Sequence, residues 1–114
     1  MKRGDIYDAR LEPVEGSEQG GIRPIIIVSR DAINQTSPLI IAVPVTTYKK
    51  SKRIYPSQII IKASIGGLSV DSIALGEQLR ALSKTRLLQC RGSLDIDSLN
   101  RLNKALSIAL ELTY

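Results

Sequence analysis

The chain has 114 residues, 43% of them hydrophobic, and its 16 Lys and Arg against 11 Asp and Glu give a formal net charge of +5 at pH 7. This length predicts a single domain over residues 1–114 with a core of its own, and the positive charge favours an acidic or polyanionic partner. With no histidine and a single cysteine, Cys90, the composition excludes histidine acid–base catalysis, an internal disulfide and a Cys/His metal cluster.

Short runs rich in β-branched residues predict strands along most of the chain. A weak strand is expected at Asp5–Arg10, and two more surround Ser72–Ala74 and Leu79–Ala81, with Gly76 between them as a bulge or turn. The connections are too short for parallel crossovers, so the sequence predicts a mainly β (α+β) fold, an antiparallel, partly closed barrel. Three further strands are apolar enough to be buried on both faces: Ile25–Val28, Leu39–Val45 and Ile59–Ile61.

The C-terminal segment has the spacing of an amphipathic helix, for which Asp95 or Asp97 is the expected N-cap. Its apolar stripe is wide enough either to cap the barrel or to meet a second copy of the chain in part, and the sequence leaves both open. Shorter helical turns are expected after Ser29 and after Ser83, which could cap Lys84–Leu88. The stripe consists of Leu99, Leu102, Ala105, Leu106, Ile108, Ala109, Leu110 and Leu112.

No run approaches the ~20 apolar residues that a membrane-spanning helix needs, and no apolar signal segment follows the first residues. We therefore expect no membrane contact. A lone thiol fits a reducing compartment, so the expected location is cytoplasmic.

Pro44 interrupts the strand that ends at Thr46 and Thr47. Because proline donates no hydrogen bond to a ladder, this strand is expected at a sheet edge or bulged at Pro44. The two hydroxyl groups would then be accessible beside the interruption, although threonine is also an ordinary strand residue.

A basic loop is expected between Thr46 and Pro56, with four cations flanked by two tyrosines. Cations that neutralise phosphates and rings that stack on bases are what a groove for single-stranded RNA uses. The alternative is a solvated hairpin whose charges guard neighbouring strands against aggregation. The side chains in question are Tyr48, Lys49, Lys50, Lys52, Arg53 and Tyr55.

Two stretches combine an acid, an amide and an arginine. In the first, Gly20 and Gly21 let a polar loop fold back and bring Arg23 to the start of a strand. Arg23 could hold a phosphate with its planar fork or, equally, form a salt bridge to Glu15 or Glu18. The second stretch, "GEQLR" at residues 76–80, repeats the combination, which indicates a shared polar cleft.

These stretches resemble one known family. "KRGDIYDARLEPVEGSEQGGIRPIIIVS" at residues 2–29 is similar to the N-terminal signature of the MazF/PemK toxins, and "GEQLRALSKTRL" at residues 76–87 resembles their second block. The similarity extends from Lys2 to about Leu112. It is carried by G-x-E-Q-x-G-x-R-P, here Gly16, Glu18, Gln19, Gly21, Arg23 and Pro24, followed at the expected distance by Thr46.

The resemblance implies an SH3-like barrel with a C-terminal helix, a homodimer, and sequence-specific endoribonuclease activity on single-stranded RNA that needs neither metal nor cofactor. It implies catalytic roles for Arg23 and Thr46. It does not name the base, for which the chemistry of 2′-OH attack makes Glu18 or Glu77 the candidate. Some PemK-type members have a histidine where this chain has Ser17 and an arginine where it has Leu75, so their acid–base arrangement is absent here. The implied pocket positions are Glu18, Gln19, Glu77, Gln78 and Arg80.

Membership also implies a partner. A type II toxin inhibits growth until a cognate antitoxin neutralises it, and the positive charge of this chain predicts that the antitoxin is acidic; the toxin–antitoxin complex would bind DNA. Two other functions fit parts of the sequence. A toxin of the same fold could poison a topoisomerase by protein contact, without needing Arg23 and Thr46, and a noncatalytic RNA-binding barrel would need only the basic loop.

Overall fold

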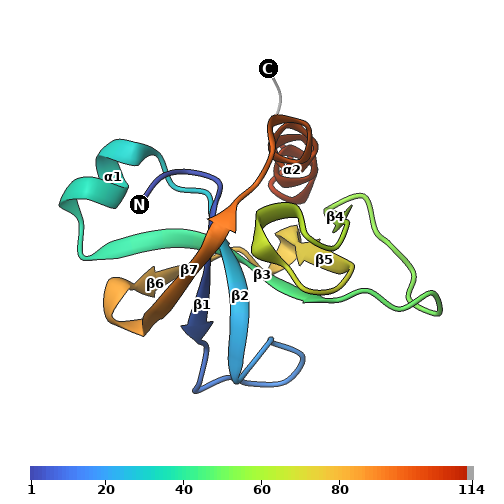
Figure 1. Ribbon diagram of the computed structural model, residues 1–114, viewed down its shortest axis with the longest axis horizontal. Helices are drawn as coiled ribbons and strands as arrows, with labels where there is room; N and C mark the ends of the chain where they lie inside the picture. The colour runs from blue at the N-terminus through green and yellow to red at the C-terminus, as the bar shows by residue number, and fades with distance from the viewer. Residues whose placement is uncertain (113–114) are drawn as a thin grey trace.

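The computed structural model of the chain describes residues 1–112, in which seven strands form one antiparallel sheet and a C-terminal helix packs beside it (Figure 1). The strands follow the order β4-β5-β3-β2-β1-β7, and β6 pairs with β3. This arrangement confirms the expected fold class. The strands are β1 (Asp5–Arg10), β2 (Ile22–Ile27), β3 (Leu39–Thr47), β4 (Gln58–Ile61), β5 (Ser72–Leu75), β6 (Arg80–Ser83) and β7 (Leu87–Ser93).

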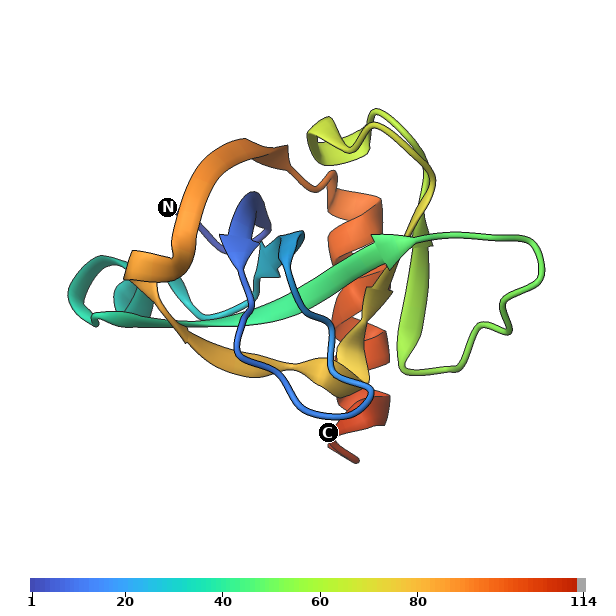
Figure 2. The same cartoon turned by 90° about the horizontal axis from the view of Figure 1, so that it is seen from below.

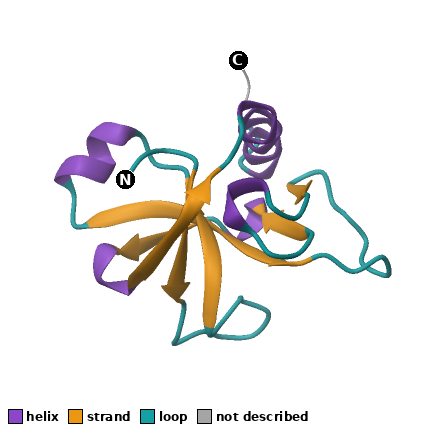
Figure 3. Ribbon diagram, viewed as in Figure 1, coloured by secondary structure: helices purple, strands orange, loops and turns teal. Residues whose placement is uncertain are grey.

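Helices occupy the ends and connections of the strands (Figure 3). The α1 helix follows Ser29 as predicted, and Asp95 caps α2 by accepting a hydrogen bond from the Ser98 N–H at 2.9 Å. Within residues 1–112, no helix has both the length and the apolar character to cross a bilayer. The helices are α1 (Asp31–Thr36), α2 (Ile96–Ala109) and the 3₁₀ turns η1 (Ile65–Gly67), η2 (Gly76–Gln78) and η3 (Lys84–Arg86).

The long strand β3 organises the sheet and runs through the middle of the molecule (Figure 2). One side of it pairs with β2, while the other pairs with β6 up to Ala42 and with β5 from Val45 onward. Of the two expected alternatives, an edge position or a bulge at Pro44, the edge position is wrong, because β3 is central. Pro44 lies where one partner gives way to the next, so its missing N–H falls at an interruption of the ladder.

Two apolar clusters lie on opposite faces of β2 and β3, which explains why residues 25–27 are apolar without alternation. Ile26 faces the cluster that α2 covers, whereas Ile25 and Ile27 face the other. Burial on both faces was wrongly expected for the first half of β3, where Leu39 is 48% and Ile41 37% exposed. The α2 helix adds Leu102, Ala105 and Leu106 to the first cluster.

Strand β7 is absent from the sequence prediction, which instead extended a helical turn over Lys84–Leu88. Ser83 does cap the turn by accepting from the Thr85 N–H at 3.3 Å, but η3 ends at Arg86. The following residues form a ladder with β1. This strand has no β-branched residue and is largely exposed, so its conformation follows from pairing with β1 rather than from its own propensity.

Candidate active site

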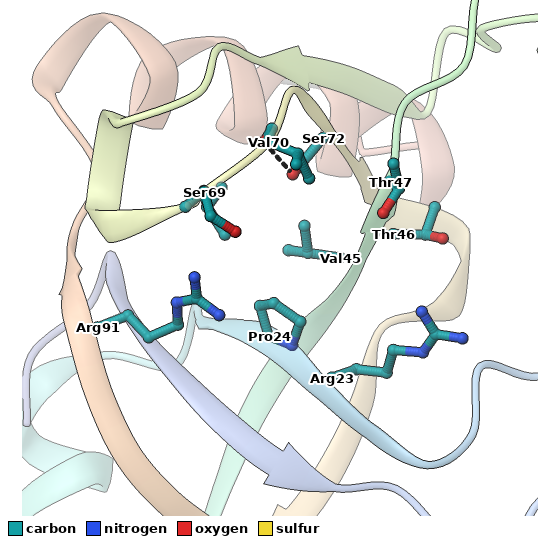
Figure 4. A pocket seen from close by; sticks show the side chains of 10 residues that line it. Arg23, Pro24, Val45, Thr46, Thr47, Ser69, Val70, Ser72 and Arg91 are labelled. Atoms are coloured by element: carbon teal, nitrogen blue, oxygen red, sulfur yellow. Dashed lines mark hydrogen bonds between the residues drawn. The ribbon is translucent and has the colours of Figure 1, made fainter.

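Arg23 on β2 and Thr46 on β3 come from neighbouring antiparallel strands. The β2–β3 ladder runs from Ile27 and Ala42 to Ile25 and Pro44, and Arg23 and Thr46 lie two residues beyond that end on their strands. Both residues line a hollow of about 180 Å³, and Figure 4 shows them on the same side of it. Two residues far apart in the sequence thus share one rim.

The Arg23 side chain is exposed and has no carboxylate partner in residues 1–112. Its Nε–H donates to the Gly20 carbonyl at 3.1 Å, which orients the guanidinium and leaves its terminal nitrogens available. Of the two alternatives for Arg23, the salt bridge to Glu15 or Glu18 is absent from residues 1–112, and the Glu18 carboxylate accepts a hydrogen bond from the Glu15 N–H at 2.6 Å. A permanently charged fork therefore faces solvent beside Thr46.

The loop before β2 is tied to η2 by one side chain. Gln78 accepts from the Gln19 N–H at 3.0 Å and donates to the Ser17 carbonyl at 3.4 Å. Gly21 has φ +71, a conformation that favours glycine, and its N–H donates to the Glu12 carboxylate at 2.8 Å. The two similar stretches meet in a polar hollow of about 450 Å³ lined by Glu18, Gln19, Glu77, Gln78 and Arg80; Arg23 is not among its residues.

A third hollow, of about 280 Å³, has lining residues in common with each of the other two. It shares Thr46 with the first and Gln19, Glu77 and Gln78 with the second. The Glu77 carboxylate is held in place there by Gln58 Nε2 at 2.7 Å and the Ser57 hydroxyl at 3.1 Å. Thr46 therefore borders both the hollow that Arg23 lines and the hollow that Glu77 lines.

The structure places only part of the basic loop at these hollows. Lys52, Arg53 and Tyr55 line the third one, where the Arg53 guanidinium lies 5.4 Å from the centre of the Tyr55 ring. Lys49 and Lys50 are exposed on the loop and line none of the three. Tyr48 is half-buried, and its backbone N–H donates to the Asp71 carbonyl at 2.8 Å.

Sequence reasoning missed Arg91, which lines the first hollow from β7. Its only signal in the sequence was its charge, because the strand that carries it was not predicted. Together the hollows present more cations than carboxylates, an arrangement suited to a polyanion. Within residues 1–112, no three side chains of the metal-ligating types gather into a group. The cations are Arg23, Lys52, Arg53, Arg80 and Arg91, and the carboxylates are Glu18 and Glu77.

Residues 2–110 match a family profile described as a PemK-like, MazF-like toxin of a type II toxin–antitoxin system. The chain belongs to this family. Two curated MazF-type proteins are similar to it over nearly their whole length. Endoribonuclease MazF of Staphylococcus saprophyticus is 41% identical over 98% of this chain and 92% of that protein, and Endoribonuclease EndoA of Bacillus subtilis is 38% identical over 98% and 96%. The expected MazF/PemK membership and the endoribonuclease class are thereby confirmed.

Solved structures confirm the MazF fold. MazF from Deinococcus radiodurans superimposes with a TM-score of 0.82 at 27% identity and covers 98% of this chain and 97% of its own. An endoribonuclease from a mycobacterial species, solved in complex with its cognate antitoxin, has a TM-score of 0.82 at 26% identity and covers 100% of this chain and 98% of its own.

Proposed function

We propose that this MazF-type toxin cleaves single-stranded RNA at short motifs and uses the RNA 2′-OH as the nucleophile. The reaction then requires alignment, stabilisation of charge on the phosphate and proton transfer, all of which side chains can supply without a cofactor. The product is a 2′,3′-cyclic phosphate or the 3′-phosphate that forms when it is hydrolysed.

The observation that carries the proposal is the shared rim of Arg23 and Thr46, with Arg23 free of any carboxylate partner among residues 1–112. Arg23 binds the scissile phosphate and stabilises the charge that develops as the 2′-oxygen attacks. Thr46 donates a hydrogen bond to a phosphate oxygen. Because the Arg23 terminal nitrogens have no intramolecular acceptor in residues 1–112, both can be used in the transition state.

Of the two candidate bases, Glu77 is the better supported. It lines the same hollow as Thr46, and two side chains fix its carboxylate. Glu18 lines only the more distant polar hollow and accepts a backbone N–H of its own loop. We assign deprotonation of the 2′-OH to Glu77, with Gln19, Gln78 and Arg80 as neighbouring substrate contacts.

The loop that carries Lys52, Arg53 and Tyr55 borders the site and would bind flanking nucleotides. Cations there pair with phosphates, and the exposed Tyr55 ring offers a surface on which an unpaired base can stack. Tyr48, Lys49 and Lys50 contribute charge and shape at the outer part of the loop.

The chain is further proposed to act as a homodimer under the control of an acidic antitoxin. An apolar groove of about 470 Å³ between α2 and the sheet leaves Ile41, Leu110 and Leu112 exposed, and a second copy would cover them. The mycobacterial relative was solved in complex with its cognate antitoxin, and one MazE–MazF structure from D. radiodurans is also similar to this chain, at 26% and 27% identity respectively. These complexes support an antitoxin as the partner of this toxin.

Primer extension over a long defined RNA, incubated with the purified protein in EDTA, tests the proposal. We expect stops at a short recurring motif, and no cleavage of a substrate with 2′-deoxyribose at the scissile nucleotide. Efficient cutting of the deoxy substrate would exclude attack by the 2′-OH. If the RNA stays intact under all conditions, the protein is either a topoisomerase poison or a noncatalytic RNA-binding barrel. RNA binding without cutting would then support the RNA-binding barrel.

A further inference from the structure

Arg91 faces the hollow from the side opposite Thr46 (Figure 4). Two partners hold it there. Its Nη1 donates to the Asp8 carboxylate at 3.2 Å, and its Nε and Nη2 donate to the Gly67 carbonyl at 3.2 and 3.0 Å. A guanidinium has five N–H donors, so one on each terminal nitrogen has no acceptor among residues 1–112. The Arg91 guanidinium is therefore fixed in place, and two of its N–H donors remain available to a ligand.

The backbone next to Arg91 is built for this contact. Gly67 has φ +75, and a Cβ on it would lie 2.1 Å from the Arg91 carbonyl oxygen, so only glycine lets the two segments approach so closely. The Arg91 and Asp8 side chains are each 25% exposed. Fixed partners and partial burial restrict the rotamers of Arg91, as required of a side chain that reads a ligand.

The charge of Arg91 differs from that of Arg23 in one decisive respect. Asp8 compensates Arg91, whereas Arg23 has no carboxylate partner in residues 1–112. A phosphate near Arg91 would also approach the Asp8 carboxylate and be repelled by it. The free donors of Arg91 therefore suit a neutral group that carries hydrogen-bond acceptors.

The surface between the two arginines suits a flat ring. Pro24, Val45 and Leu68 line the hollow with apolar groups, and Thr47 and Ser69 line it with hydroxyl groups. The hollow has a volume of about 180 Å³, more than one ion requires. Unpaired RNA bases are recognised in such places, by contact with their faces and hydrogen bonds to their edges.

We propose that this hollow is a base subsite in which Arg91 donates to the O6 and N7 atoms of a guanine flanking the scissile phosphate. Guanine presents two neighbouring acceptors, and arginine reads them with two parallel donors. The inference rests on the proposed function, since Arg23 and Thr46 at the other end of the hollow would hold the phosphate of the same nucleotide step. Asp8 acts as a positioning residue for Arg91.

The test uses an RNA pool randomised around one cleavage site, followed by defined substrates with guanine, adenine or 7-deazaguanine at the selected position. The wild type should prefer guanine at one position by roughly 10- to 100-fold, and Arg91→Gln should lose that preference while leaving preferences elsewhere unchanged. Wild type should cut the 7-deazaguanine substrate roughly 10-fold more slowly, since only N7 is missing, and Arg91→Gln should cut both alike. Arg101→Gln is the matched control, because Arg101 also joins a carboxylate and a backbone carbonyl but lies outside the hollow.

The inference is wrong if Arg91→Gln slows all sequences equally, or if wild type cuts 7-deazaguanine and guanine substrates at the same rate. The second result needs no variant and holds even if Arg91→Gln fails to fold. The affinities of the protein for uncleavable 2′-deoxy versions of the same RNAs are measured in parallel. If the wild type cleaves nothing, the proposed function is contradicted, but the binding data still show whether guanine is preferred. Asp8→Asn should keep the guanine preference and steepen the salt dependence of binding by about 0.7, and an unchanged slope would contradict its charge-compensating role.

Discussion

Arg23 is the side chain on which turnover should depend most. Arg23→Ala removes a positioned cation from the phosphate and should lower the cleavage rate on the order of 10²-fold or more, by analogy with the loss of one transition-state donor. Thr46→Ala removes a neutral hydrogen bond and should cost less. Single-turnover cleavage of the motif found by primer extension measures both.

The fold should tolerate Arg23→Ala, because the side chain is exposed and its one hydrogen bond goes to the Gly20 carbonyl. Thermal unfolding provides the control, together with Arg23→Lys, which retains the charge without the planar fork and should recover part of the rate. Unfolding of Arg23→Ala would mean that Arg23 stabilises the loop rather than the transition state.

The sequence alone predicts some of the residues of the candidate site. Arg23, Glu18 and Gln19 belong to a recognisable motif. The similar stretch at residues 76–80 predicts a shared polar cleft, and residues of both stretches line the polar hollow around Gln78. Arg91 could not be found in this way. Its position depends on a Gly67 carbonyl and an Asp8 carboxylate that only the tertiary fold brings to it.

Among the elements, the loop between β3 and β4 should carry much of the electrostatic affinity for RNA. Replacing its four cations with glutamine should weaken binding and flatten its salt dependence by about 0.7 in slope for each phosphate that the loop no longer neutralises. Fluorescence anisotropy at several salt concentrations measures the slope. An unchanged slope would support the alternative, in which the charges only protect neighbouring strands from aggregation. The cations are Lys49, Lys50, Lys52 and Arg53.

The N-cap of α2 makes a separate prediction about acid stability. Hydrogen bonds from Ser98 lower the pKa of Asp95 below its usual 3.8. A carboxyl group with a lowered folded-state pKa contributes stability above the unfolded value, and that stability is lost as the pH falls through the folded value. Asp95→Asn keeps an acceptor for the cap at every pH, so its melting temperature should fall less below pH 3.8.

Melting curves at neutral pH and in acid measure this difference. Asp97→Asn is the matched control, because it removes the same charge from the same turn without touching the cap. Equal acid sensitivity in wild type and Asp95→Asn would contradict the role of the ionised cap.

Some helices and strands follow from the local sequence pattern, and others do not. The apolar run of β2 was predictable because both faces of that strand are buried, and α2 was predictable because its apolar residues recur at helical spacing. The sequence shows that Pro44 interrupts β3, but it does not show whether the strand is at an edge of the sheet. An edge strand and a central strand that changes partners at a proline have the same sequence pattern. Strand β7 has neither alternation nor β-branched residues, and only pairing with β1 reveals it.

At the scale of the whole molecule, the groove beside α2 predicts how two copies meet. The helix covers its own core with Leu102, Ala105 and Leu106, yet Leu110 remains 52% exposed at the rim of an apolar groove. Leu110→Glu should therefore place a charge in the dimer contact and shift the protein to monomers. Analytical ultracentrifugation measures the shift.

The matched control is Ile96→Glu, a change on the same helix at a residue that is 79% exposed and does not line the groove. It should leave the oligomeric state unchanged. If Leu110→Glu still forms a dimer, the dimer interface lies on another face of the molecule.

The antitoxin should compete directly with RNA, because the +5 chain places Arg23, Thr46 and the loop cations Lys52 and Arg53 around two hollows that both include Thr46. An acidic, partly disordered segment that folds along them would cover Arg23 and the loop cations, and electrostatic attraction would speed its capture. The acidic protein encoded by the adjacent gene is titrated against labelled RNA on Arg23→Ala, which should bind RNA without cutting it. We expect RNA to be released in proportion to the antitoxin added, at a concentration that rises with the RNA present. A stable ternary complex at saturation would show that the two ligands occupy separate surfaces.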